Sequence, residues 1–214
     1  MKIFLDTANV LDVEDRLITK VISGVTTNPT LIKKNGEDPD VVYKEMIDAG
    51  IEDLSIEVKG DIADDLVANG IIYNRQFGDK ATIKLPCTVH GIRACKILSS
   101  LNIRTNVTLV FSVSQAILCS LAGATYVSPF VGRLDQIGED GIGLIEDIAK
   151  VFCIHESKTQ ILAASIRSAT SVAQSFKAGA HICTIPPKVF DNLYKHDLTE
   201  QGLAQFAIDF GKNV

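Results

Sequence analysis

A lysine stands inside an apolar segment near the middle of the chain. Lys84 lies in Ala-Thr-Ile-Lys-Leu-Pro at positions 81–86, where its neighbours are apolar or β-branched. If this segment is a strand that is covered on both faces, the amine is withdrawn from bulk water, and a buried amine is more readily neutral. A neutral amine attacks a ketone to form an imine, which withdraws electrons from a neighbouring C–C bond. Lys84 is therefore a candidate Schiff-base residue; the alternatives are an ammonium that extends to the surface or one that pairs with a carboxylate.

Two carboxylates occupy similar apolar segments. Asp6 ends the run Ile-Phe-Leu-Asp at 3–6, and Glu57 lies within Leu-Ser-Ile-Glu-Val-Lys at 54–59. Cleavage of a C–C bond beside a hydroxyl needs a base for the hydroxyl proton, and imine hydrolysis needs a positioned water, so the two carboxylates could divide these tasks. Alternatively, Asp6 caps the following helix, and Glu57 pairs with Lys59 or with a neighbouring strand.

Two arginines follow apolar segments in the C-terminal half. Arg133 ends Pro-Phe-Val-Gly-Arg at 129–133, and Arg167 lies in Ala-Ser-Ile-Arg-Ser at 164–168. Two guanidiniums together with Ser165 would hold a phosphate dianion well. Surface salt bridges are the alternative. The four histidines have neither HxxxH nor HExxH spacing, so they are interpreted as capping or surface groups and no metal is predicted.

The scaffold that must position these residues is indicated by a repeated pattern. Short, often β-branched apolar runs recur, and each precedes a longer stretch with helical spacing of its apolar residues. The predicted strands are 3–6, 24–28, 54–59, 82–86, 105–110, 126–130, 160–165 and 183–186. The predicted helices are 11–20, 40–49, 63–73, 90–100, 112–121, 141–155, 168–177 and 187–194. Polar residues lie in or just after most of these strands, as Asn28, Asn106, Thr108 and Ser128 illustrate.

Eight such units are the number that closes a barrel, and the active site of a barrel collects at the C-terminal ends of its strands. We therefore predict a (β/α)8 TIM barrel that forms one domain over residues 1–214, with a doubly wound sheet as the runner-up. A further amphipathic segment at 199–212 is predicted to be an additional C-terminal helix. This helix could pack on its own barrel or on a neighbouring subunit.

Bulk properties exclude several other classes of protein. The net charge is −5 and no basic run is present, which argues against nucleic acid as a partner. No apolar run is long enough for a membrane span, and Asp6 interrupts the N-terminal apolar residues too early for a signal peptide. The five cysteines include no CxxC pair and are interpreted as buried thiols of a cytoplasmic protein.

In their order along the chain, these segments resemble the small transaldolase family, which also contains fructose-6-phosphate aldolases. The resemblance extends over the whole chain. Its most specific pieces are Leu-Asp-Thr-Ala at 5–8, Gly-Val-Thr-Thr-Asn-Pro-Thr at 24–30, Ile-Lys-Leu-Pro at 83–86, Thr-Asn-Val-Thr-Leu-Val-Phe-Ser at 105–112, Tyr-Val-Ser-Pro-Phe-Val-Gly-Arg-Leu-Asp at 126–135 and Leu-Ala-Ala-Ser-Ile-Arg at 162–167.

The resemblance implies a role for each candidate residue. Lys84 would form the Schiff base, and Asp6 would handle the proton of the substrate hydroxyl. Glu57 and Thr108 would hold the water of the imine chemistry. The implied substrate contacts are Asn28 and Asn106 to the sugar, Phe130 in the substrate site, and Arg133, Ser165 and Arg167 to the phosphate. A ketose phosphate such as fructose 6-phosphate or sedoheptulose 7-phosphate would leave a dihydroxyacetone unit on the lysine, in the pentose phosphate pathway, without a cofactor.

Two positions favour a transaldolase over an aldolase. The aldolase branch of the family has glutamine where this chain has Glu57 and tyrosine where it has Phe130. An aldolase that releases free dihydroxyacetone remains an alternative, as does a catalytically silent barrel that binds sugar phosphates. A pyridoxal phosphate enzyme, which also uses a lysine imine, is conceivable. The chain departs from the family in Thr-Val-His-Gly at 88–91, where an acidic residue is common.

The family resemblance also implies an assembly. Members form rings, with pentamers paired into decamers and the C-terminal helix reaching a neighbour. We therefore expect a homo-oligomer in which the 199–212 segment has this role.

Overall fold

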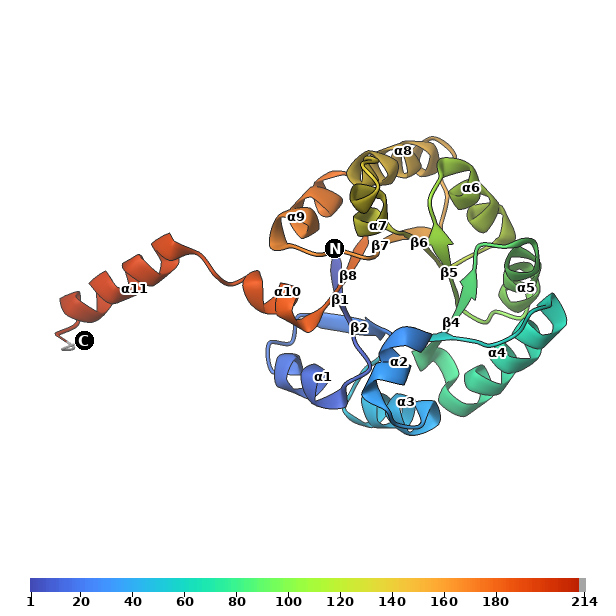
Figure 1. Ribbon diagram of the computed structural model, residues 1–214, viewed down its shortest axis with the longest axis horizontal. Helices are drawn as coiled ribbons and strands as arrows, with labels where there is room; N and C mark the ends of the chain where they lie inside the picture. The colour runs from blue at the N-terminus through green and yellow to red at the C-terminus, as the bar shows by residue number, and fades with distance from the viewer. Residues whose placement is uncertain (212–214) are drawn as a thin grey trace.

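The computed structural model describes residues 1–211, and its eight parallel strands close into a barrel in sequence order (Figure 1). The strands are β1 (Lys2–Asp6), β2 (Ile22–Thr26), β3 (Leu54–Glu57), β4 (Ala81–Pro86), β5 (Thr105–Val110), β6 (Tyr126–Pro129), β7 (Gln160–Ala163) and β8 (Ile182–Ile185). The pairing of β1 with β8 closes the ring. The predicted (β/α)8 barrel is therefore confirmed, and the doubly wound sheet is wrong.

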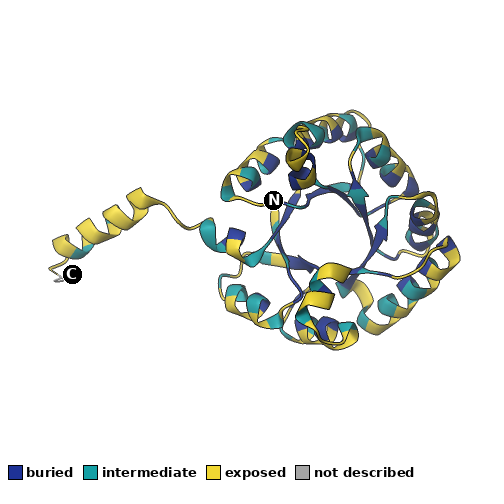
Figure 2. Ribbon diagram, in the orientation of Figure 1, coloured by how far each residue is buried: buried dark blue, intermediate teal, exposed yellow. Residues whose placement is uncertain are grey.

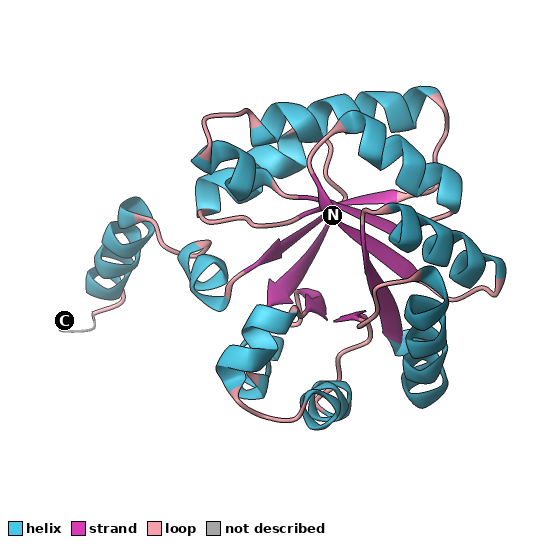
Figure 3. Ribbon diagram, turned by 45° about the vertical axis from the view of Figure 1, so that its right-hand side comes forward, coloured by secondary structure: helices cyan, strands magenta, loops and turns pink. Residues whose placement is uncertain are grey.

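Helices surround the ring of strands, as Figure 3 shows. They are α1 (Val10–Leu17), α2 (Pro29–Asn35), α3 (Pro39–Asp48), α4 (Ala63–Phe77), α5 (Val89–Ser100), α6 (Val113–Ala122), α7 (Val131–Gln136), α8 (Gly141–Ile154), α9 (Ala169–Lys177), α10 (Pro187–Asn192) and α11 (Asp197–Asp209), with a 3-10 turn η1 (Gly78–Lys80). The short helices α2 and α7 were not predicted. Each follows a strand and lies beside the cavity described below.

Two hydrophobic clusters hold the barrel together. The larger one fills the space between the strands and the surrounding helices. The smaller one includes Phe4, Tyr126, Leu162 and Ile182. Figure 2 shows the burial of the strands and of the inward faces of the helices. Apolar residues on both faces of the strands are what a parallel sheet covered by helices requires.

The last helix stands apart from the barrel. No residue of α11 is buried, and the figures show it projecting away from the ring. It therefore does not pack on its own barrel, which was one of the two predicted arrangements. The predicted segment was 199–212, and its final residue, Lys212, lies outside the described residues. Within residues 1–211, no helix is long and apolar enough to cross a bilayer.

The cysteines are less uniformly buried than the sequence suggested. Cys95, Cys119 and Cys183 are buried, whereas Cys87 is half-buried and Cys153 is exposed. The interpretation that all five are interior thiols is therefore wrong for Cys87 and Cys153. Cys153 lies near the C-terminal end of α8, where its side chain is exposed although the adjacent Phe152 is buried.

Candidate active site

A cavity of about 490 Å³ opens at the C-terminal ends of the strands. It is lined by every residue that the sequence and the resemblance singled out: Asp6, Asn28, Glu57, Lys84, Asn106, Thr108, Phe130, Arg133, Ser165 and Arg167. These residues come from seven strands, β1 to β7, and the connections that follow them, so the closed barrel brings together positions that are far apart in the sequence. This is the end of the barrel where enzymes of this fold carry their active sites.

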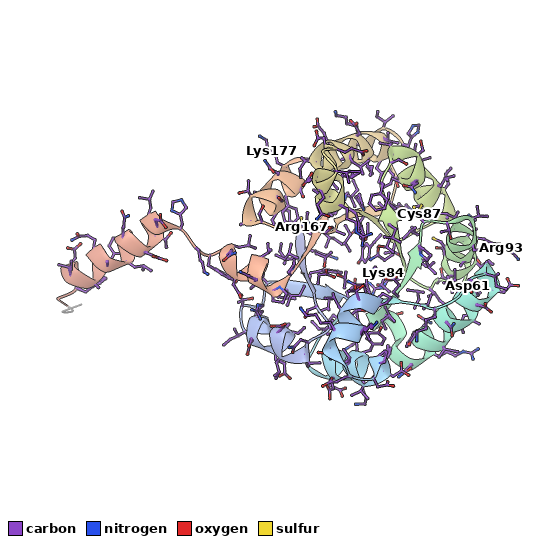
Figure 4. The ribbon with its side chains drawn as sticks, viewed as in Figure 1. Asp61, Lys84, Cys87, Arg93, Arg167 and Lys177 are labelled. Carbon is purple, nitrogen blue, oxygen red and sulfur yellow. The ribbon has the colours of Figure 1, made fainter. Side chains whose placement is uncertain are left out.

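Lys84 projects from β4 into the ring of strands, where Figure 4 labels it. Its side chain is only 7% exposed, and its Nζ donates hydrogen bonds of 3.0 Å to Glu57 Oε2 on β3 and of 3.0 Å to the Thr27 carbonyl. The side chain therefore does not extend to the surface, and of the alternatives the pairing with a carboxylate is the one observed. The partner of Glu57 is thus the neighbouring strand and not Lys59. These two acceptors fix the direction of the amine.

Asp6 lies at the end of β1 and does not cap a helix, because Asn9 caps α1. Its Oδ1 accepts a hydrogen bond of 2.8 Å from Thr26 Oγ1. Thr26 Oγ1 is in turn 2.7 Å from the hydroxyl of Thr184, which must donate because the Thr26 proton is directed at Asp6. Burial raises the pKa of Asp6 above its usual range, against the opposing effects of the Thr26 hydrogen bond and the positive charge of Lys84. A carboxyl whose pKa is raised holds a proton more readily than a free aspartate does, which suits a group that must accept and return a proton.

A second chain of hydrogen bonds orients Asn106 on β5. Its Oδ1 accepts from Ser128 Oγ at 2.6 Å, and its Nδ2 donates to Ser55 Oγ at 3.1 Å. These contacts fix the orientation of the amide, with its oxygen toward Ser128 and its nitrogen toward Ser55, and leave the second N–H free for a ligand. The nearby hydroxyl of Thr108 is buried and has no hydrogen-bond partner among residues 1–211. An unpartnered buried hydroxyl beside a polar cavity is suited to hold a water or a ligand oxygen.

The backbone is strained at two positions on the cavity wall. Leu109 and Ser165 both have φ values of +60°, in the left-handed region that side chains disfavour. Leu109 lies where the register between β5 and β6 shifts, directly after Thr108. Strain of this kind persists only where the surrounding structure enforces it, and it concentrates at functional sites.

The two arginines line the cavity from the connections after β6 and β7, two and three strands along the ring from Lys84 on β4. Arg133 belongs to α7, and its guanidinium lies 5.0 Å from the centre of the Phe130 ring. Arg167 follows β7, and both arginines are exposed. Within residues 1–211 neither makes a salt bridge, so the surface ion pairs offered as the alternative are not observed. Two free guanidiniums near Ser165 form a positively charged rim that suits a phosphate group.

Sequence reasoning missed the groups that hold the candidate residues in place. They are the hydroxyls of Thr26 and Thr184, the carbonyl of Thr27 and the hydroxyl of Ser55. A threonine in a strand is explained equally well by β propensity, a serine there has no distinctive spacing, and a backbone carbonyl carries no signal in the sequence. Within residues 1–211, no group of three His, Cys, Asp or Glu side chains has the arrangement of a metal site.

Comparison with known proteins gives consistent matches over nearly the whole chain. Residues 3–212 match the family model described as Transaldolase/Fructose-6-phosphate aldolase. A probable transaldolase of Symbiobacterium thermophilum is 48% identical over 98% of this chain and 97% of its own length. A probable transaldolase of Clostridium acetobutylicum is 47% identical over 98% and 97%. A probable transaldolase 2 of Bacillus anthracis is 45% identical over 99% and 98%.

Proposed function

The chain belongs to the transaldolase/fructose-6-phosphate aldolase family, and on that premise we propose that it is a transaldolase that works through a Schiff base on Lys84. The observation that carries the proposal is the enclosed Lys84 amine, 3.0 Å from Glu57, in a cavity that Arg133 and Arg167 also line. A ketose phosphate fits such a cavity with its carbonyl at the lysine and its phosphate at the arginines. The substrates are therefore proposed to be sugar phosphates.

The proposed reaction begins with attack of the neutral Lys84 amine on the ketose carbonyl. Glu57 is close enough to take the proton that the ammonium must lose, and later to hold the water that is expelled when the imine forms. The unpartnered Thr108 hydroxyl is the second group proposed to hold that water. Hydrolysis of the imine at the end of the cycle uses the same water site in reverse.

Asp6 is proposed to take the proton of the hydroxyl beside the bond that breaks. The electrons of the C–C bond pass into the imine, an aldose phosphate leaves, and a dihydroxyacetone enamine stays on Lys84. The enamine then attacks the aldehyde of a second aldose phosphate, and Asp6 returns its proton to the new hydroxyl. Because the pKa of Asp6 is raised by burial, the carboxyl can hold the proton between the two half-reactions.

The alternatives differ in what happens to the dihydroxyacetone unit. Glu57 and Phe130 match the transaldolase side of the family, which favours transfer. An aldolase would release free dihydroxyacetone without an acceptor, and a silent sugar-phosphate barrel would leave Lys84 unmodified. The exposed helix α11 supports the further proposal of a homo-oligomer, in which α11 packs on a neighbouring subunit.

The test is to trap the imine with borohydride in the presence of fructose 6-phosphate, with and without erythrose 4-phosphate, and to measure intact mass. We expect a dihydroxyacetone-sized adduct on Lys84 that the acceptor depletes. Lys84→Ala should fold, form no adduct and lose on the order of 10³-fold or more in turnover. Lys177→Ala, which removes an exposed lysine of α9, is the matched control and should behave as wild type.

Three results would change the assignment. Free dihydroxyacetone at the full turnover rate without an acceptor would establish the aldolase. A folded wild-type protein without any adduct would favour the silent binding barrel. Near-full turnover by Lys84→Ala would exclude the Schiff base on this lysine.

A further inference from the structure

A pair of thiols lies next to the candidate site but has no part in the proposed reaction. Cys87 Sγ is 3.9 Å from Cys119 Sγ. Cys87 lies in the connection between β4 and α5, three residues after Lys84, and Cys119 lies on α6. Cys95 and Cys183 have different contacts, to Thr105 Oγ1 and to the Val172 carbonyl. The two paired sulfurs are therefore in van der Waals contact without being bonded.

The two thiols differ in reactivity and in access to solvent. Cys87 is half-buried, whereas Cys119 is fully buried. The hydrogen bond from Cys119 lowers the pKa of Cys87, and the proximity of Cys87 together with burial raises the pKa of Cys119. Cys87 also immediately precedes Thr88, the N-cap of α5, and the N-terminus of a helix stabilises a thiolate. Cys87 is thus the thiol that a small oxidant reaches and that ionises first.

We propose that Cys87 and Cys119 form an oxidisable dithiol, which hydrogen peroxide converts to an intramolecular disulfide that slows turnover in the barrel. The Cys87 thiolate attacks one peroxide oxygen, which gives a sulfenic acid and hydroxide. The Cys119 sulfur then attacks Cys87 Sγ and expels the sulfenic oxygen as water. Overall, two thiols lose two electrons and two protons, and one peroxide becomes two waters.

The backbone provides a route from the thiols to the active site. The N–H of Cys87 donates a hydrogen bond of 2.9 Å to the carbonyl of Thr108, and the preceding Pro86 pairs with Thr108 in the sheet. A disulfide needs a sulfur–sulfur distance of about 2.05 Å, so the two sulfurs must approach by nearly 2 Å. Movement of Cys87 toward α6 pulls on the strand end that holds the Thr108 hydroxyl. This effect on turnover rests on the proposed function, whereas disulfide formation does not.

The experiment treats the reduced full-length protein with hydrogen peroxide, blocks the remaining thiols by alkylation, and maps the cysteine peptides by mass spectrometry. Turnover of fructose 6-phosphate with erythrose 4-phosphate is measured on the same samples. We expect a linked Cys87–Cys119 peptide, a several-fold fall in turnover, and recovery of both on reduction with dithiothreitol. Cys153→Ala, which removes the exposed thiol, should respond in the same way as wild type.

A second variant separates the dithiol from general oxidation. Cys87→Ala should form no linked peptide and keep its turnover in peroxide. The dithiol is overturned if peroxide oxidises Cys153 while both Cys87 and Cys119 are alkylated as free thiols. A linked peptide with unchanged turnover overturns the effect on catalysis. If the reduced protein has no turnover at all, the proposed function has failed, and peptide mapping alone then decides whether the dithiol exists.

Discussion

At the scale of single residues, Asp6 lies in the cavity at the end of β1 and is proposed to be the base that takes the hydroxyl proton. It is half-buried, lies in the same cavity as Lys84 and accepts a hydrogen bond from Thr26. Asp6→Asn retains the size and the acceptor but cannot exchange a proton, so we expect turnover to fall by about 10²- to 10⁴-fold while the fold is kept. Steady-state kinetics on purified, folded protein measure this loss. Turnover within a few-fold of wild type would remove Asp6 from the role of base.

The same substitution has a signed effect on stability. Because burial raises the pKa of Asp6, the folded protein binds this proton more tightly than the unfolded chain does. The carboxyl therefore costs stability at neutral pH, and that cost disappears as the pH falls through the raised pKa and then below the ordinary value of 3.8. Urea denaturation across this range should find Asp6→Asn more stable than wild type at neutral pH, with a difference that shrinks on acidification. A constant difference would contradict the raised pKa.

The site residues that could be predicted from the sequence are mainly charged side chains in segments that are otherwise apolar. A lysine or a glutamate inside an apolar run demands an explanation, and all of the predicted candidates line the cavity. Thr26, Thr27 and Thr184 could not be found in this way, because a threonine in a strand needs no explanation. Their contribution depends on which strands become neighbours, and only the closed barrel reveals that.

At the scale of elements, the approach of α7 to β7 shapes the side of the cavity that carries the arginines. A Cβ on Gly132 would lie 2.1 Å from the Ser165 carbonyl and 3.0 Å from Arg167 Nε. Gly132→Ala must therefore push α7 outward and displace Arg133. We expect the KM for sugar phosphates to rise by about tenfold or more, while Lys84 is still trapped by borohydride at saturating substrate. Gly202→Ala on α11, where no atom of the described residues lies within 4 Å of the added Cβ, is the control and should leave KM unchanged.

The opposite end of the barrel depends on a buried carboxylate for stability. Asp53 accepts hydrogen bonds from Thr82 (2.8 Å), Arg104 (2.7 Å) and Tyr126 (2.7 Å). Asp53→Asn replaces one acceptor oxygen by an NH2 group, which cannot accept a hydrogen bond from these donors. We therefore expect a loss of about 2–4 kcal/mol in the free energy of unfolding, measured in urea. Lys84 of the folded fraction should still be trapped, because this network lies at the end remote from the cavity. A loss below about 0.5 kcal/mol, as expected for the exposed control Asp48→Asn, would show that the network is dispensable.

Element prediction succeeded where an element repeats a pattern over several turns or alternations. The strands and the longer helices were found to within a few residues, although β2 begins at Ile22 instead of Gly24. The helices α2 and α7 were missed because seven and six residues are too few to establish a period, whereas α10, which is equally short, was predicted as the longer helix 187–194. The signals for α2 were nevertheless present, since Asn28 caps the helix and Pro29 occupies its first turn.

At the scale of the whole molecule, α11 is the part of the protein that the barrel does not explain. Its apolar side chains are exposed, with Leu203 at 63% and Phe206 at 60%, and Phe210, the residue that caps its C-terminus, is 82% exposed. A helix with this many exposed apolar residues normally covers another surface. The amphipathic spacing of residues predicted the helix. Spacing is a local property, however, and does not identify the surface on which the helix packs. The proposed homo-oligomer provides such a surface.

If α11 packs on a neighbouring subunit, charges on its apolar face should weaken the assembly without damaging the barrel. Burying one leucine or phenylalanine side chain contributes about 1.5–3 kcal/mol, so Leu203→Asp with Phe206→Asp should cost each contact about 3–6 kcal/mol, or at least 100-fold in affinity. Light scattering coupled to size-exclusion chromatography should then report a smaller species. Thr199→Lys, on the same helix, is the matched control and should leave the wild-type mass unchanged.

The catalytic cavity gives this prediction a second readout. All residues that line it belong to the barrel of one chain, and none lies on α11. The dissociated variant should therefore still form the borohydride-trapped adduct on Lys84, which separates loss of assembly from loss of fold. An unchanged oligomer mass would show that α11 is not the contact, and a wild-type protein that is monomeric at every concentration would exclude the assembly itself. Loss of the adduct together with the assembly would instead mean that the neighbouring subunit supports the cavity, a dependence that the contacts within one chain do not predict.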